Sequence, residues 1–308
     1  KEIQRPVQQV VMEALTSEKV SLNSRASTFF KELQETICST VEKVDGQRIF
    51  SIDRWSHPQG GGGDTRVIEH GGVFEKGGVN FSDVQGRLND KLAQRLNIIP
   101  QAFQATGISL VLHPYNPMIP TVHFNLRYLE LENGDSWFGG GTDLTPYYLN
   151  EDDAVHFHST LKRVCVKHNP SYYSRFKKWC DEYFFVKHRQ EARGIGGIFF
   201  DYLRDQPERT FAFVQDVGNA FLEAYNPIVK KRMKEPWGEP ERQWQLHRRG
   251  RYAEFNLVYD RGTLFGLETE GRIESILMSL PPVVQWSYNV QPEPGSRAAK
   301  LVEVLGKP

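Results

Sequence analysis

Cysteine, net charge and long apolar runs are all scarce in this 308-residue sequence. The three cysteines, Cys38, Cys165 and Cys180, are far apart and form no CxxC or CxxxCxxC motif, which argues against zinc ribbons, thiol redox motifs and iron–sulfur clusters. The 38 basic and 38 acidic side chains cancel, so the sequence has no electrostatic footprint for nucleic acid or an anionic membrane. Because no run of about 18 apolar residues occurs, we expect no segment to span a bilayer.

The amino terminus also lacks the apolar core of a signal peptide. Residues 1–19 mix acids, bases and glutamines, which is not typical of a transit peptide either. We therefore expect a cytoplasmic protein and leave open whether a processed targeting segment precedes residue 1. No repeat or low-complexity linker divides the chain, so we expect one α+β domain over residues 1–308, with 1–22 as a peripheral segment.

The richest stretch runs from residue 113 to 145. Within it, residues 121–131 predict a strand with one buried face, because Val122, Phe124, Leu126 and Tyr128 occupy alternate positions. The other face carries His123, Asn125 and Arg127, and such a row is costly to bury unless each group is paired. This row is therefore the first candidate for a functional surface.

The segments on either side of this strand complete the pattern. Residues 107–112 predict a second strand with Ser109 on one face, and Asn133-Gly134 predicts a hairpin turn into a third strand from Ser136. Glycines 139–141 leave the backbone bare, so a flat ligand or another chain segment can approach it closely.

Helices and further strands are predicted elsewhere by periodicity and punctuation. The glycine-rich region 60–78 lacks the GK[ST] and GxGxxG signatures, so we expect strands there rather than a phosphate loop. His158 and His188 are expected on the inward faces of their helices. The expected helices are 7–15, 24–44, 150–165, 172–189 and 209–233, and strands are expected at 48–55 and 194–203.

A second rich stretch covers residues 247–282. Alternation over 252–259 predicts a strand that Asp260, Arg261 and Gly262 close, and residues 263–268 predict another strand. A helix is expected to follow from Arg272. Arginines at 127, 261 and 272 suit a broad, apolar ligand edged with carboxylates, because the guanidinium fork matches a carboxylate. In such a pocket Asp260 could accept hydrogen bonds from ligand N–H groups, and His123 could move a proton.

Five longer motifs stand in order along the chain and are far more specific than these short patterns. They are HPxNPxxPTxHxNxR, WFGGGxDLTP, KKWCDEYF followed by KHR, RGIGGIFFD and EFNLxYDRGTLFGL. Together they resemble the oxygen-dependent coproporphyrinogen III oxidase family of haem biosynthesis, from about residue 27 to 282. The resemblance implies an α+β fold, with a large antiparallel sheet flanked by helices on both faces.

The resemblance also implies an activity. The family converts two propionate side chains of coproporphyrinogen III to vinyl groups with molecular oxygen, and releases protoporphyrinogen IX, carbon dioxide and peroxide. In family terms, a pyrrole is deprotonated, oxygen adds to the electron-rich ring, and the peroxide removes the β-hydrogen of the propionate as it decarboxylates. A tetracarboxylate macrocycle with four pyrrole N–H groups matches the ligand inferred above.

Carried over motif by motif, the resemblance assigns roles to particular residues. His123 is similar to the family's general acid/base, and Asp260 to the carboxylate placed against the pyrrole nitrogens, with Arg261 beside it as a third catalytic residue. The implied substrate contacts are Ser109, Asn125, Leu126, Arg127, Glu270, Gly271 and Arg272.

Partners and cofactors are implied in the same way. We expect a homodimer formed through about residues 252–287, and no required cofactor besides oxygen as co-substrate. A divalent metal is left open, because positions matching four histidines have been proposed as ligands in some bacterial members. These candidates are His113, His123, His158 and His188, although no HExxH motif or acidic partner at metal spacing accompanies them.

Two rival functions are compatible with the same residues. A metal-dependent oxygenase or hydrolase built on the four histidines predicts bound metal and inactivation by a chelator. A tetrapyrrole carrier without chemistry predicts tight binding without turnover, with His123 serving only as a hydrogen-bond donor.

Overall fold

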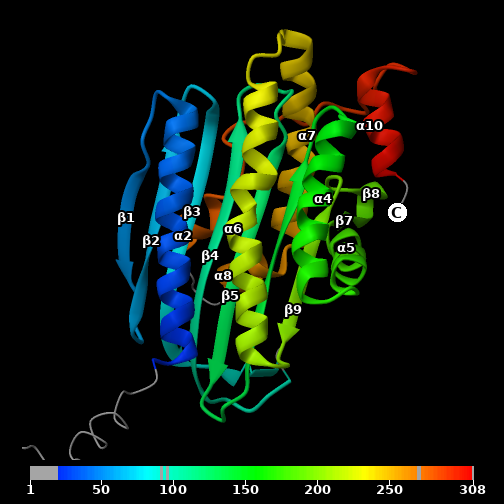
Figure 1. Cartoon of the computed structure of the whole chain (residues 1–308). Helices are drawn as coiled ribbons and strands as arrows, with labels where there is room; N and C mark the ends of the chain where they lie inside the picture. Colours follow the sequence, from blue (N-terminus) through cyan, green and yellow to red (C-terminus); the bar gives the residue numbers. More distant parts are fainter. Residues whose placement is uncertain (1–19, 91–92, 95–96, 269–271, 307–308) are drawn as a thin grey trace, which may run out of the picture.

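The structure, a computed structural model, describes residues 20–90, 93–94, 97–268 and 272–306. Within these ranges the chain forms a large sheet with helices in front of it and behind it (Figure 1). The expected α+β class, with an antiparallel sheet flanked by helices on both faces, is confirmed. The short helix expected at 7–15, and with it most of the segment 1–22, lies outside the described residues.

The main sheet has seven antiparallel strands in the order β1-β2-β3-β4-β5-β6-β9, and β7 and β8 form a separate two-stranded ribbon. Each of the first six strands pairs with its neighbour in the chain, so the sheet is a meander to which β9 is added at one edge. The bounds are β1 (Ser51–Ser56), β2 (Gly61–Glu69), β3 (Phe74–Arg87), β4 (Ala102–Pro114), β5 (Thr121–Leu131), β6 (Ser136–Thr145), β7 (Phe185–Val186), β8 (Glu191–Ala192) and β9 (Gly197–Leu203).

The helices are distributed over the two faces of the sheet. In Figure 1, α2, α4 and α6 lie in front of it, whereas α7 and α8 lie behind it. None of the helices in the described ranges is long and apolar enough to cross a membrane. The bounds are α2 (Leu22–Asp45), α4 (Glu151–His168), α5 (Tyr172–Tyr183), α6 (Pro207–Arg232), α7 (Glu239–Val258), α8 (Arg261–Glu268), α9 (Ile273–Leu277) and α10 (Arg297–Leu305), with a short 3-10 helix η1 (Lys187–Arg189).

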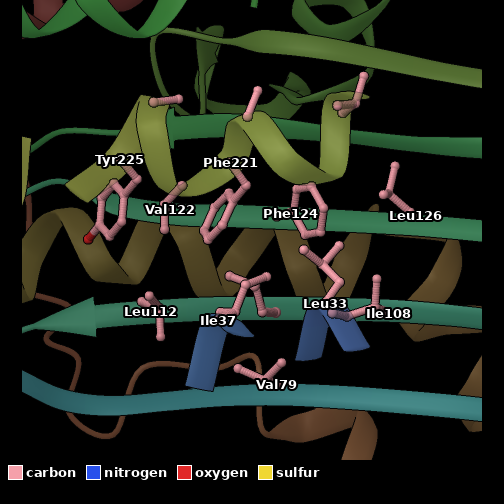
Figure 2. Packing of buried hydrophobic residues seen from close by; sticks show 14 of the residues in the cluster. Leu33, Ile37, Val79, Ile108, Leu112, Val122, Phe124, Leu126, Phe221 and Tyr225 are labelled. Atoms are coloured by element: carbon pink, nitrogen blue, oxygen red, sulfur yellow. The ribbon is translucent and has the colours of Figure 1, made fainter. Parts of the chain in front are cut away.

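The hydrophobic core lies between the front face of the sheet and helices α2 and α6. Figure 2 shows Leu33 of α2 and Phe221 of α6 packed against Phe124 of β5. The ring centroids of Phe124 and Phe221 lie 4.8 Å apart, and both side chains are fully buried. Successive side chains of a strand point to opposite faces, so every second side chain of β5 points away from this core.

The ends of α2 and α4 are capped by side-chain hydrogen bonds and by a glycine. The side chain of Ser21 accepts a hydrogen bond from the Ser24 amide at the start of α2, and Gly46 ends that helix with a φ of 71°. Asn150 caps α4 in the same way, through the Asp153 amide. These local signals place the two helices without reference to tertiary contacts.

The strands predicted at 252–259 and 263–268 are wrong, because the structure has the end of α7 and α8 there. The buried residues of α7 recur with helical spacing, but several of them are polar. Arg249, for example, is fully buried and donates to Glu75 at 2.6 Å. Hydrophobic periodicity misses a helix whose buried face is held by ion pairs, and the last seven residues of α7 imitate an alternating strand.

The helix predicted over 172–189 is too long. α5 ends at Tyr183, and the chain then forms the β7–β8 ribbon around η1. The Arg193 amide donates to the Phe184 carbonyl at 2.9 Å, which ties the two sides of this ribbon together. His188 therefore lies on the turn of the ribbon and not on the inward face of a helix.

Candidate active site

The polar residues of β5 lie on the face of the sheet opposite the core. His123, Asn125 and Arg127 are half-buried, whereas the alternate residues Phe124 and Leu126 are fully buried among the core side chains. The predicted separation of the two faces is therefore confirmed. Leu126, expected among the substrate contacts, points into the core (Figure 2), so its side chain faces away from the polar row.

Strand register extends this polar face across the sheet. Asn125 of β5 pairs with Ser109 of β4. Ser109 in turn pairs with Asn80 of β3, and Asn80 pairs with Thr65 of β2. Neighbouring strands are about 4.8 Å apart, so these four side chains form a line that crosses the strands. Thr65 and Asn80 were not predicted, because only the register between distant strands shows that they share this line.

His123 is held by hydrogen bonds at both ring nitrogens. Its Nδ1 lies 2.8 Å from Oδ1 of Asp143, the cross-strand partner on β6, and its Nε2 lies 3.2 Å from Nδ2 of Asn125. Oδ1 of Asn125 accepts from Arg127, which can only donate, so the amide nitrogen of Asn125 faces His123. Nε2 is therefore the accepting nitrogen, and Nδ1 carries the proton that is donated to Asp143.

Asp143 is a buried carboxylate that the sequence motifs contained but did not assign. Burial by itself would favour the neutral acid, but the charge of Arg193 and the hydrogen bond from His123 outweigh it and hold the pKa of Asp143 below its ordinary value. A carboxylate that stays ionised beside Nδ1 keeps His123 oriented and leaves Nε2 to exchange protons with a ligand.

Arg127 is fixed at the other end of the row. Its Nη2 donates to Asp201 of β9 at 2.6 Å, and a side chain at Gly139 would place Cβ 2.5 Å from that aspartate and 2.8 Å from Nε of Arg127. Gly139 thus makes room for the pair. The sequence predicted that a flat ligand or another chain segment would approach the glycines. At Gly139, the groups that approach are the side chains of Arg127 and Asp201 from the neighbouring strands.

Asp260 and Arg261 lie at the junction of α7 and α8, and not at a strand end as predicted. Oδ2 of Asp260 accepts from the amide and the hydroxyl of Thr263, both at 2.8 Å, which caps the first turn of α8. Oδ1 accepts from the Tyr183 hydroxyl at 3.0 Å. The guanidinium of Arg261 is exposed and lies 5.4 Å from the Tyr183 ring centroid.

The remaining predicted substrate contacts are only partly described. Arg272 precedes α9 and is hydrogen-bonded to Asp53 of β1 and to Ser275, so it lies over the β1 side of the sheet. Glu270 and Gly271 lie outside the described residues.

The polar face is flanked by two groups of side chains. On one side, Ser275 of α9 is hydrogen-bonded to Thr65 at 2.7 Å. On the other side, the Tyr183 ring stacks on Phe199 of β9 with centroids 4.4 Å apart. Ser109, Asn125 and Arg127 are half-buried between these groups, which is the arrangement expected for a surface that contacts a ligand.

The three other candidate metal ligands are each hydrogen-bonded to partners different from those of His123. His113 bonds Thr121 and the Ser279 carbonyl, and burial lowers its pKa well below the ordinary value. His158 bonds the Tyr173 hydroxyl and the Ile195 carbonyl, and His188 bonds Tyr259 and Glu254. Within the described ranges, no group of three or more His, Cys, Asp or Glu side chains is arranged to hold a metal ion.

The fold and these side chains together define an α+β protein whose sheet carries a row of His, Asn and Arg side chains on the face opposite the hydrophobic core. The comparison with known families agrees with this class. The model of the coproporphyrinogen III oxidase family matches residues 25–308. The chain therefore belongs to that family of haem-biosynthesis oxidoreductases, as the motif resemblance predicted.

Proposed function

We propose that the chain is an oxygen-dependent coproporphyrinogen III oxidase that forms protoporphyrinogen IX. Each of two steps converts R–CH₂–CH₂–COO⁻, O₂ and H⁺ to R–CH=CH₂, CO₂ and H₂O₂, so two electrons pass from the side chain to oxygen. The observation that carries the proposal is the row of His123, Asn125 and Arg127. On this polar face, His123 would accept a proton and the guanidinium fork of Arg127 would bind a carboxylate.

The arginines and Asp260 would bind opposite parts of such a substrate. The forks of Arg127 and Arg272 suit propionate carboxylates. A carboxylate has roughly four acceptor positions. Asp260 uses three of them for Tyr183 and Thr263, and the fourth suits a pyrrole N–H. Exposed Arg261 beside it would offset the charge of the substrate.

His123 would act as the general acid/base through Nε2. Asn125 donates to this nitrogen and would be displaced when a substrate proton is transferred there. Pyrrole deprotonation makes the ring electron-rich enough to react with oxygen, and the peroxide formed then removes the propionate β-hydrogen. In this scheme no cofactor besides oxygen is required.

We also propose a cytoplasmic homodimer that associates through about residues 252–287. Six exposed apolar side chains among the described residues of this segment support the proposal, because a homodimer interface buries such groups. They are Leu257, Val258, Leu267, Ile273, Val283 and Trp286. We expect Val258→Asp to shift the protein from dimer to monomer in analytical ultracentrifugation, with Val155→Asp, at an exposed valine of α4, as the control. A monomeric wild type would contradict the proposal.

The activity is tested by incubating chelator-treated protein with coproporphyrinogen III in air and under argon, and measuring protoporphyrin fluorescence after oxidation. Product in air alone supports the cofactor-free oxidase. Product only after a metal is restored would favour the metal-dependent rival, and binding without product under any condition would favour the carrier. His123→Ala should abolish turnover, whereas His156→Ala, at a histidine of α4 bonded to the Glu223 carbonyl, should not.

A further inference from the structure

Arg193, between β8 and β9, is a buried cation that none of the roles above uses. Its Nη2 donates to Oδ2 of Asp143 at 2.7 Å, while the other oxygen of Asp143 accepts from His123. Nη1 of the same guanidinium donates at 3.0 Å to Asn256, on the last turn of α7. One side chain thus links the acid–base histidine on β5 to the helix that leads into Asp260.

The guanidinium is held in place by aromatic rings. Its Cζ lies 4.0 Å from the centroid of Phe184, 4.5 Å from Tyr252 and 4.9 Å from Phe255. Both Arg193 and Asp143 are 2% exposed, so solvent screens their interaction little. Nε is buried without a hydrogen-bond partner among the described residues, so the two Nη groups alone set the orientation of the fork.

The consequence concerns the state of His123. An isolated buried carboxylate would take up a proton, and a neutral Asp143 could donate to Nδ1 as well as accept from it. With the cation of Arg193 on Oδ2, the carboxylate stays charged and can only accept. His123 is then confined to the tautomer with a proton on Nδ1 and a free lone pair on Nε2.

We infer that Arg193 is a positioning residue, which acts through Asp143 to fix the tautomer and orientation of His123, and which ties this geometry to α7 through Asn256. Arg193 does not touch the substrate in this role. The inference rests on the proposed function for its catalytic meaning, but the tautomer of His123 is measurable without turnover.

Other titratable groups face the same pair and would contribute to any pH profile. Tyr252 and Asp260 belong to the α7 side, His113 to β4 and Cys180 to α5. A shift assigned to His123 must therefore come from the ¹⁵N signals of its own ring.

The test compares Arg193→Gln with Arg248→Gln. Arg248 is an equally suitable buried arginine, 4% exposed and paired at 3.0 Å with Glu191, but it does not contact Asp143. In ¹⁵N NMR, wild-type protein and Arg248→Gln should show His123 protonated on Nδ1, whereas Arg193→Gln should show a mixture of tautomers. We expect kcat to fall about 100-fold in Arg193→Gln, within the range of general acid–base effects, with KM little changed.

Two further variants separate positioning from folding. Arg193→Lys keeps the positive charge but loses the forked guanidinium, so its kcat should lie between those of Arg193→Gln and the wild type. Asn256→Ala removes one contact of the fork without changing any charge, and should broaden the His123 signals with a smaller loss of kcat, which gives a result even if Arg193→Gln does not fold. A single native tautomer and unchanged kcat in the folded variants would overturn the inference. Wild-type protein that shows the fixed tautomer but no turnover would instead refute the proposed function.

Discussion

Substitution of Arg127 should impair substrate binding strongly while changing the free energy of unfolding little. Its side chain is 42% exposed, and its ion pair with Asp201 spans 2.6 Å. Exposed pairs contribute about 0–1 kcal/mol to folding, so Arg127→Gln should lower the free energy of unfolding by less than about 1 kcal/mol. A hydrogen bond from Arg127 to a substrate carboxylate would contribute about 1.5–3 kcal/mol, which corresponds to a loss of about 10- to 150-fold in kcat/KM.

The assay is steady-state turnover of coproporphyrinogen III, accompanied by urea unfolding of each variant. The control is Arg204→Gln, because Arg204 is also 42% exposed and is paired with Asp135 at 3.0 Å, but lies beyond the end of β9, over the Trp137 ring. Both variants should unfold at similar urea concentrations. Equal kcat/KM values in the two variants would refute the assignment of the polar face as the substrate surface.

Two predictions concern stability. Phe124→Ala should lower the free energy of unfolding by about 3–5 kcal/mol in urea titrations, because the ring is fully buried against Phe221; a loss under 1 kcal/mol would contradict the packing described. For Glu254, burial would raise the pKa, but hydrogen bonds from Arg189, His188 and Trp286 lower it to about 2. Its folded pKa lies below the unfolded one, so its stabilising effect is present above pH 4.5 and lost as pH falls towards 2. The stability difference between wild type and Glu254→Gln should therefore be larger at pH 7 than at pH 3, and a difference independent of pH would count against this network.

Local patterns were sufficient for the strands that carry the polar row of the candidate site. The alternation of apolar and polar residues over 122–128 predicted the strand and the face on which each of these side chains lies. The Asn133-Gly134 turn then fixed the hairpin that brings β6 beside it. These signals depend on only a few neighbouring residues, so they can be read from the sequence without knowledge of the tertiary structure.

Local sequence patterns could not predict the contacts between segments that are distant in the chain. Asp143, Asp201 and Arg193 become neighbours of the polar row only through the pairing of β5, β6 and β9. The helical conformation of 252–258 was missed for a related reason. It depends on buried ion pairs such as Arg249 with Glu75, which replace the apolar stripe that marks an ordinary amphipathic helix.

The two faces of β5 also determine how this strand tolerates sequence change. Substitutions at Val122, Phe124 and Leu126 should reduce the amount of folded protein, whereas those at His123, Asn125 and Arg127 should leave the protein abundant but impaired. Along the strand, the two kinds of defect should alternate residue by residue. A plot of abundance against position would therefore oscillate with a period of two, and a plot of activity per folded molecule would oscillate in the opposite phase.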